Sequence, residues 1–127
     1  MATLKVGVVS PEREIWAGEA RMVVAQTIEG QLGILPGHAP VLGVLLDGSV
    51  VKIETAGGEW VSAMVGSGFF SIADDEVSIL AEQAELGTEV DVAAARQALQ
   101  DAQAEAGADS TAERRARARL RAAGSEV

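Results

Sequence analysis

The sequence predicts a mainly β protein that ends in helices: an N-terminal antiparallel β-sandwich followed by a C-terminal antiparallel two-helix hairpin. Three observations lead to this prediction. Of the 14 glycines, 12 lie in residues 1–90, and short apolar runs separated by turn residues recur there. Of the 23 alanines, 13 lie in residues 91–127. Because valine and glycine favour strands and turns whereas alanine favours helix, we expect a β domain over residues 1–87 and a hairpin over residues 88–127.

The strands are predicted from short apolar runs, several with alternating buried and polar positions. Asp47-Gly48 and Gly57-Gly58 lie between such runs, where glycine supplies the positive φ that tight hairpin turns need. No helical pattern intervenes, so this spacing indicates an antiparallel sandwich or barrel. The expected strands cover residues 4–9, 14–16, 21–27, 43–46, 49–55, 59–65, 69–73 and 76–81.

Residues 30–40 contain three glycines and two prolines, which predicts a shaped loop rather than a strand or a helix. Ile34 and Leu35 are expected to anchor this loop to the core. His38, the single histidine, has no cysteine, serine or acidic pair beside it. We therefore interpret His38 as a structural or contact residue rather than a general base or a metal ligand.

The first helix is predicted from about Asp91, which can cap its first turn, to Ala106, and Gly107 is a plausible stop. An alternative cap is Thr88. Residues 110–113 read Ser-Thr-Ala-Glu, a capping box that starts a second helix, and Gly124 ends it.

Each predicted helix carries a stripe of small apolar residues. The stripes are Val92, Ala95, Leu99, Ala102 and Ala106 on the first helix, and Ala112, Ala116, Leu120 and Ala123 on the second. At about 25 cal/mol per Å² of buried apolar area, an alanine seam contributes much less than a leucine seam. Two interpretations stay open: a weakly held hairpin built to detach, and a hairpin that docks and stays.

Five arginines flank the second stripe: Arg114, Arg117 and Arg121 on one side, Arg115 and Arg119 on the other. They fit a solvated helix face, a nucleic-acid contact, an acidic protein surface or a nucleotide phosphate. The net charge of −9 and the absence of tyrosine argue against nucleic acid. Arg115 and Arg119 lie one helical turn apart and could grip one anion together.

The composition excludes several classes of protein. The chain has no cysteine, which rules out a disulfide scaffold, a thiolate zinc site and a cysteine nucleophile. No apolar run approaches the ~20 residues that span a bilayer, so we expect no direct membrane insertion. A small hydrolase would have to use Glu82, Glu85 and His38, but the carboxylates fit better as a solvated boundary between sheet and helix.

Three segments resemble the epsilon subunit of bacterial F-type proton-translocating ATP synthases. They are Gly33-Ile34-Leu35-Pro36-Gly37-His38-Ala39-Pro40, Gly66-Ser67-Gly68-Phe69 and Val77-Ser78-Ile79-Leu80-Ala81-Glu82-Gln83-Ala84. The resemblance covers essentially the whole chain. It implies a sandwich of about ten strands, a helical hairpin and no catalysis by the chain itself.

The resemblance also implies a place in a complex. Such a subunit belongs to the central rotor stalk, binds the gamma subunit, rests on the membrane proton-carrying ring and couples proton-driven rotation to ATP synthesis. It is a peripheral protein at the cytoplasmic face of the cell membrane. The implied ring or stalk contact residues are Glu29, Gly30, Gln31, Gly33 and His38.

In some relatives the hairpin inhibits ATP hydrolysis at the catalytic head, and in some it folds down with ATP bound. The resemblance carries the nucleotide pattern to Glu85, Asp91, Arg115 and Arg119. Ala94 stands where the pattern has an arginine. We therefore expect no required cofactor and ATP as a weak regulatory ligand at most. Acidic surface on a partner would meet Arg114, Arg117 and Arg121.

A rival hypothesis is a free β-sandwich adaptor whose arginine-rich helix recruits an acidic protein. Stable association with a gamma subunit separates the two hypotheses, because only the stalk subunit needs it.

Overall fold

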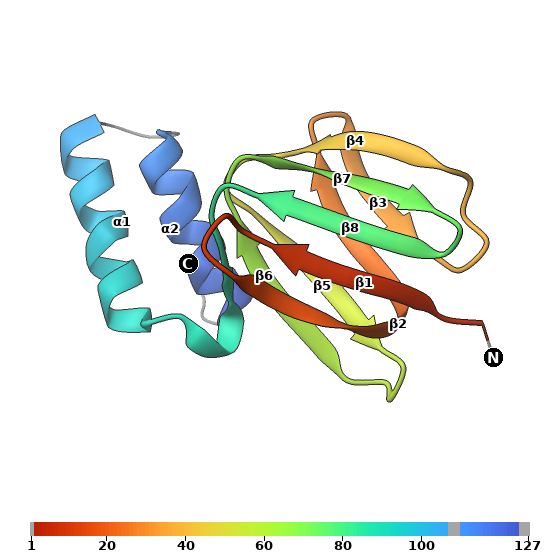
Figure 1. Ribbon diagram of the computed structural model, residues 1–127. Coiled ribbons are helices and arrows are strands. Elements are labelled where there is room, and N and C mark those ends of the chain that lie inside the picture. Colours follow the sequence, from red (N-terminus) through yellow and green to blue (C-terminus); the bar gives the residue numbers. More distant parts are fainter. Residues whose placement is uncertain (1, 107–109, 125–127) are drawn as a thin grey trace.

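The computed structural model describes residues 2–106 and 110–124. In these residues nine strands precede two helices, which confirms the predicted β-sandwich and helical hairpin (Figure 1). The strands are β1 (Leu4–Val9), β2 (Glu14–Thr27), β3 (Gly30–Ile34), β4 (Val41–Leu45), β5 (Ser49–Thr55), β6 (Trp60–Val65), β7 (Gly68–Ala73), β8 (Glu76–Ala81) and β9 (Ala84–Leu86). The short 3-10 turn η1 (Gly87–Glu89) leads to helices α1 (Val92–Ala106) and α2 (Thr111–Ala122).

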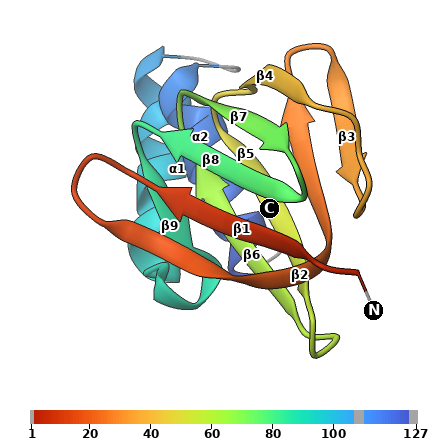
Figure 2. The ribbon, with the colours of Figure 1, turned by 45° about the vertical axis from the view of Figure 1, so that its right-hand side comes forward.

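Strand β2 takes part in both layers of the sandwich (Figure 2). Its first half pairs with β1, from Glu14 to Ala20, and its second half pairs with β3 and β5. A register shift between Ala20 and Met22 marks the passage from one layer to the other. The neighbouring pairs are antiparallel except that β1 runs parallel to β8.

The core lies between the layers and consists of the inward positions of alternating strands. Strand β8 shows the pattern clearly, since Val77, Ile79 and Ala81 are buried whereas the residues between them are exposed. The largest fully buried side chains of the sandwich are Phe70, Leu4, Ile34, Ile53, Met64, Ile72 and Ile79.

Three local predictions were wrong. Residues 30–34 form strand β3, because pairing with β2 from Val23 to Thr27 outweighs the loop signal of the glycines. Within the predicted anchor only Ile34 is buried, whereas Leu35 is 56% exposed. The expected break between residues 16 and 21 is also absent, because residues 17–19 pair with Lys5, Val6 and Gly7 of β1.

The helix ends follow the predicted signals. The backbone N–H of Ala94 donates to Asp91 Oδ1 at 3.0 Å, so Asp91 caps α1. The N–H of Glu113 donates to Ser110 Oγ at 3.1 Å, which caps α2, and Gly124 follows α2 with φ 81°. The predicted stop at Gly107 lies outside the described residues.

Helix α2 lies between α1 and the sandwich (Figure 1). It contacts α1 on one side and β5, β6 and η1 on the other. Of its predicted stripe, Ala116 and Leu120 are buried but Ala112 is exposed. A second pair, Ala118 and Ala122, packs instead against Val50 and Met64 of the sandwich.

Glycines of the sandwich allow this close approach. A Cβ at Gly48 would lie 2.8 Å from the Cβ of Arg114, and a Cβ at Gly87 would collide with the carbonyl group of Ala122. The backbone of α2 therefore rests directly on the turn before β5 and on η1.

We expect Gly87→Ala to loosen the last turn of α2, because the colliding atoms belong to the helix backbone and cannot rotate away. Hydrogen exchange by NMR should show faster exchange of the amides of residues 119–122. Gly7→Ala is the matched control, since a Cβ there meets nothing within 4 Å. Equal exchange in both variants would contradict the close contact.

Candidate functional site

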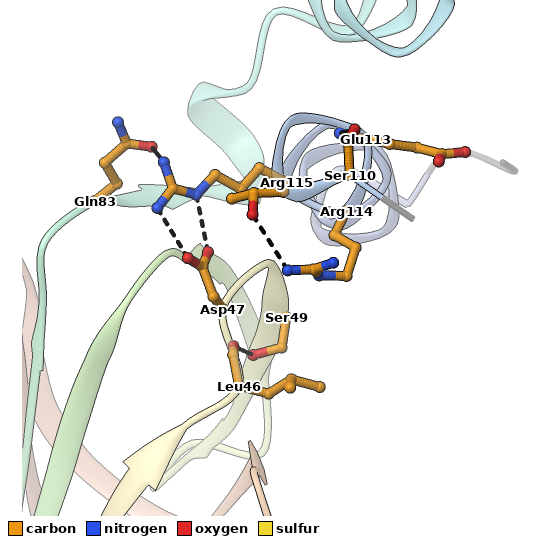
Figure 3. A network of polar contacts seen from close by, with 9 residues as sticks. Leu46, Asp47, Ser49, Gln83, Ser110, Glu113, Arg114 and Arg115 are labelled. Atoms are coloured by element: carbon orange, nitrogen blue, oxygen red, sulfur yellow. Dashed lines mark hydrogen bonds and ion pairs between the residues drawn. The ribbon is translucent and has the colours of Figure 1, made fainter. Parts of the chain in front are cut away.

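The guanidinium of Arg115 on α2 is held by the sandwich rather than left free for a ligand. Its Nε donates to Asp47 Oδ1 at 2.8 Å and its Nη2 to Asp47 Oδ2 at 3.0 Å (Figure 3). Its Nη1 donates to Gln83 Oε1 at 3.3 Å. Hydrogen bonding to Asp47 raises the pKa of Arg115. This two-pronged pair is the strong geometry for an arginine and a carboxylate.

Arg119, one turn further along α2, faces Glu85 of β9. Its Nε lies 3.3 Å from Glu85 Oε1, yet this buried nitrogen has no hydrogen-bond partner among the described residues. The pair is therefore a charge contact without an aligned hydrogen bond. Arg119 and Glu85 line a cleft of about 300 Å³ together with Ser10, Glu12, Arg13, Ile15, Met64, Glu82, Gln83 and Ala84.

The structure brings together only two of the four residues of the expected nucleotide pattern. Glu85 and Arg119 come together, but Arg115 is bound to Asp47 and Asp91 caps α1 through the backbone N–H of Ala94. Both arginines thus already meet carboxylates of the chain itself. Gln83 and Asp47, which sequence analysis did not assign to this site, complete it.

The other arginines of α2 have different surroundings. Arg117 donates to Glu113 Oε1 at 3.0 Å, and Gln103 of α1 donates to the same oxygen at 3.2 Å, so these residues form a polar seam inside the hairpin. Arg114 contacts the hydroxyl of Thr111. Arg121 is exposed and lines a cleft of about 580 Å³ with Lys52, Val24, Gln26, Gln31, Leu46, Gly48, Ser49, Val50 and Gly124.

Four of the five expected ring-contact residues follow one edge. Glu29 is in the turn between β2 and β3, and Gly30, Gln31 and Gly33 are exposed along β3. The turn is fixed by Thr27, whose hydroxyl donates to the carbonyl oxygen of Gly30 at 2.7 Å. Strand β3 pairs with β2 alone among the described strands, so it is an edge strand.

His38 lies beyond the opposite end of β3 from Glu29. Its backbone N–H donates to the carbonyl oxygen of Leu35, and Gly37 has φ 86°, as in a type II turn. The N–H of Gly37 donates to Asp75 Oδ1 at 2.7 Å, which ties this turn to the β7–β8 connection. The structure therefore does not place His38 beside Glu82 or Glu85, as the hydrolase alternative requires.

An exposed apolar face covers β4, β7 and β8, and sequence analysis missed it. Val44 lies opposite Phe69, and Phe69 lies opposite Leu80, so their side chains form a row across three strands. We call this the apolar face; it consists of Ile28, Leu42, Val44, Phe69 and Leu80, which are 40–74% exposed. The helices contact β5, β6 and η1 instead, so they do not cover it.

A signal for the apolar face does exist in the sequence. Residues 41–46 read Val-Leu-Gly-Val-Leu-Leu, with apolar residues on both sides of the strand. A strand with one solvated side alternates between apolar and polar residues, whereas a strand covered on both sides is apolar throughout. Large exposed apolar surfaces of this kind mark interaction sites.

The connection to the hairpin is tied to the sandwich by one exposed pair. Arg13, between β1 and β2, donates to Glu89 Oε1 of η1 at 2.9 Å. This hydrogen bond lowers the pKa of Glu89.

The described residues contain neither a membrane-spanning helix nor a metal-ligand cluster. No helix in them has the length and apolar character to cross a membrane. No group of three or more metal-ligating side chains gathers within residues 2–106 and 110–124.

Comparison with known proteins agrees with the fold. Residues 3–87 match the family model of the ATP synthase delta/epsilon chain β-sandwich domain. The chain is 51% identical over 121 residues to an ATP synthase epsilon chain of Streptomyces avermitilis, covering 95% of both chains. It is 54% identical over 129 residues to an ATP synthase epsilon chain of Thermobifida fusca, covering 97% of this chain and 93% of the relative.

Solved structures share the fold at lower identity. A chain of the Euglena gracilis mitochondrial ATP synthase assembly of OSCP, F1 and c-ring superposes with a TM-score of 0.73 at 22% identity. The match covers 94% of the present chain and 76% of that one. A chain of the Tetrahymena thermophila central stalk and c-ring gives a TM-score of 0.58 at 19% identity, covering 86% and 78%.

We expect Arg13→Gln to raise the pKa of Glu89 toward its ordinary value. The pair stabilises the folded state above the unfolded pKa of Glu89, and its contribution is lost as pH falls through the lowered folded value. An NMR titration of the Glu89 carboxyl carbon measures this change. Arg21→Gln makes the same chemical change elsewhere and should leave the titration as in the wild type. An unchanged Glu89 titration in Arg13→Gln would refute the pair.

Proposed function

The chain belongs to the ATP synthase epsilon family, whose members are subunits of ATP synthase and not catalytic by themselves, and we propose a division of labour between its two parts. Residues 1–87 attach the chain to the central stalk and the proton-carrying ring, and so couple proton-driven rotation to ATP synthesis. Residues 88–127 form a regulatory hairpin. The apolar face is the single observation that carries this proposal.

The apolar face docks on the gamma subunit. A row of large apolar side chains on three neighbouring strands is costly to leave in water, and the hairpin contacts other strands. Interfaces that persist have an apolar centre of this kind. A free adaptor that uses only the arginines of α2 would leave the apolar face without a role.

The ring contact uses the exposed edge of β3. Glu29 and Gln31 present polar side chains, and Gly30 and Gly33 leave the backbone accessible for a close approach. His38 extends the same contact beyond the end of the strand. Through the ring the chain is a peripheral protein at the cytoplasmic face of the membrane.

The hairpin acts on the catalytic head when it leaves the sandwich. Arg114, Arg117 and Arg121 then meet acidic surface there and slow ATP hydrolysis. ATP is at most a weak ligand of the docked form, because a phosphate would compete with Asp47 for Arg115 and with Glu85 for Arg119.

We expect Phe69→Ser to weaken binding to the gamma subunit of the same organism by about 10- to 100-fold, because the lost apolar contact is worth about 1.5–3 kcal/mol. Isothermal titration calorimetry gives the Kd. Trp60→Ser is the matched control, because Trp60 is 52% exposed against 46% for Phe69 and lies outside the apolar face. Equal Kd values for the two variants would reject the apolar face as the docking site.

A chain ending at Val90 should restore proton-driven ATP synthesis to membranes depleted of the subunit, because it keeps the nine strands of the described residues. ATP hydrolysis should rise above that of membranes rebuilt with the full chain, because the hairpin is gone. Equal hydrolysis with both chains would remove the regulatory role, and failure of both to restore synthesis would remove the coupling role.

A further inference from the structure

The apolar contact between α2 and the sandwich is small. Its fully buried part consists of two alanine side chains, Ala118 and Ala122, against Val50 and Met64. Methyl groups bury little area, so this contact alone gives α2 only a weak hold. Polar contacts must then decide how much of the time α2 stays docked.

The strongest polar contact is prepared by the sandwich. Asp47 lies in the turn before β5, where Gly48 has φ 76° and its N–H donates to the carbonyl oxygen of Val65 at 3.0 Å. The buried hydroxyl of Ser49 donates to the carbonyl oxygen of Leu46 at 2.7 Å and closes the same turn (Figure 3). The Asp47 carboxylate is therefore fixed before the arginine arrives.

On α2, all three guanidinium nitrogens of Arg115 donate hydrogen bonds to residues of the sandwich. Arg115 binds both oxygens of Asp47 and the side-chain oxygen of Gln83. Gly66 leaves room for it, because a Cβ there would lie 3.4 Å from the Arg115 guanidinium. The side chains of Arg115 and Asp47 are each only about a quarter exposed, 24% and 26%, so water screens them less than a surface pair.

We infer that the Asp47–Arg115 pair is the latch that holds α2 on the sandwich, and that the chain's own carboxylate occupies the arginine in place of a nucleotide phosphate. Docking is then independent of ATP and weakens as ionic strength rises. The role of docking in regulation rests on the proposed function, but the latch itself is a property of the isolated chain.

The test is amide hydrogen exchange of the full chain, wild type against Asp47→Asn. Released helices of this length are marginal in water, so undocking exposes the α2 amides to exchange. We expect about tenfold faster exchange over residues 111–122 in Asp47→Asn, as for the loss of one strong charged pair of about 1.4 kcal/mol. Strand β5 should keep the exchange rates of the wild type.

Asp74→Asn is the matched control. It removes the same charge at an exposed residue of the β7–β8 turn with φ 51°, which asparagine tolerates, and it should exchange as the wild type does. Unchanged α2 exchange in Asp47→Asn would overturn the latch.

Asp47→Asn could also disturb the turn and β5. Arg115→Gln is therefore a second variant, because it removes the same ion pair and leaves the turn intact. Faster exchange of α2 alone in Arg115→Gln supports the latch, and wild-type exchange overturns it. Combining the two changes should add nothing to either one, whereas additive effects would show that the residues act independently.

Fluorescence reports undocking directly. Both tryptophans of the chain, Trp16 and Trp60, line a cleft of about 370 Å³ with Ala122 and Ala123 of the α2 end. Their emission should shift to the red in Asp47→Asn and in wild type at high salt, but not in Asp74→Asn. Absence of any shift in Asp47→Asn would overturn the latch.

Millimolar ATP distinguishes the latch from a nucleotide clamp. We expect ATP to leave α2 exchange of the wild type unchanged, and a many-fold slowing would overturn the claim that Asp47 replaces the phosphate. In our proposal the gamma subunit binds the apolar face on β4, β7 and β8, whereas α2 docks on β5, β6 and η1. Normal gamma binding without a latch effect would therefore refute the latch alone, and a latch effect without gamma binding would refute the proposed function alone.

Discussion

Strand β2 pairs with strands of both layers, so its continuity fixes how the two layers face each other. Glu14 to Ala20 bind β1, and the residues after the register shift bind β5 and β3. Because one backbone belongs to both layers, the apolar face, the β3 edge and the seat of α2 are held at fixed positions relative to one another. A central-stalk subunit that takes part in transmitting rotation needs this rigidity.

Much of the fold could be predicted from the sequence because its signals are local. Strands β5 and β8 lie at their predicted residues, and the caps at Asp91 and Ser110 follow from side-chain chemistry. Strand β3 was not predicted, since its glycines weaken local strand propensity, although its pairing partner is the adjacent end of β2 across a two-residue turn. Strand β9 is three residues long and was hidden among the acidic residues near Glu85.

The candidate site likewise has a part that was predictable from local sequence and a part that was not. The arginine-rich face of α2 was evident from spacing, but the partner of each arginine depends on tertiary contacts. Asp47 was predicted only as part of a turn, although that turn presents its carboxylate to Arg115. The apolar face was missed because β4 and β7 are not consecutive strands, so the pairing that places Val44 opposite Phe69 has no local signal in the sequence.

The glycines under α2 have a consequence for comparing relatives. At Gly48 and Gly87 any side chain would clash with the helix backbone. The β domain therefore has to keep small residues at these two positions for α2 to dock as it does. A relative with a larger residue at either position cannot seat its last helix in the same way, whatever that helix contains. An alignment of the β domain therefore identifies, from the residues at positions 48 and 87, which relatives can dock the last helix as this chain does.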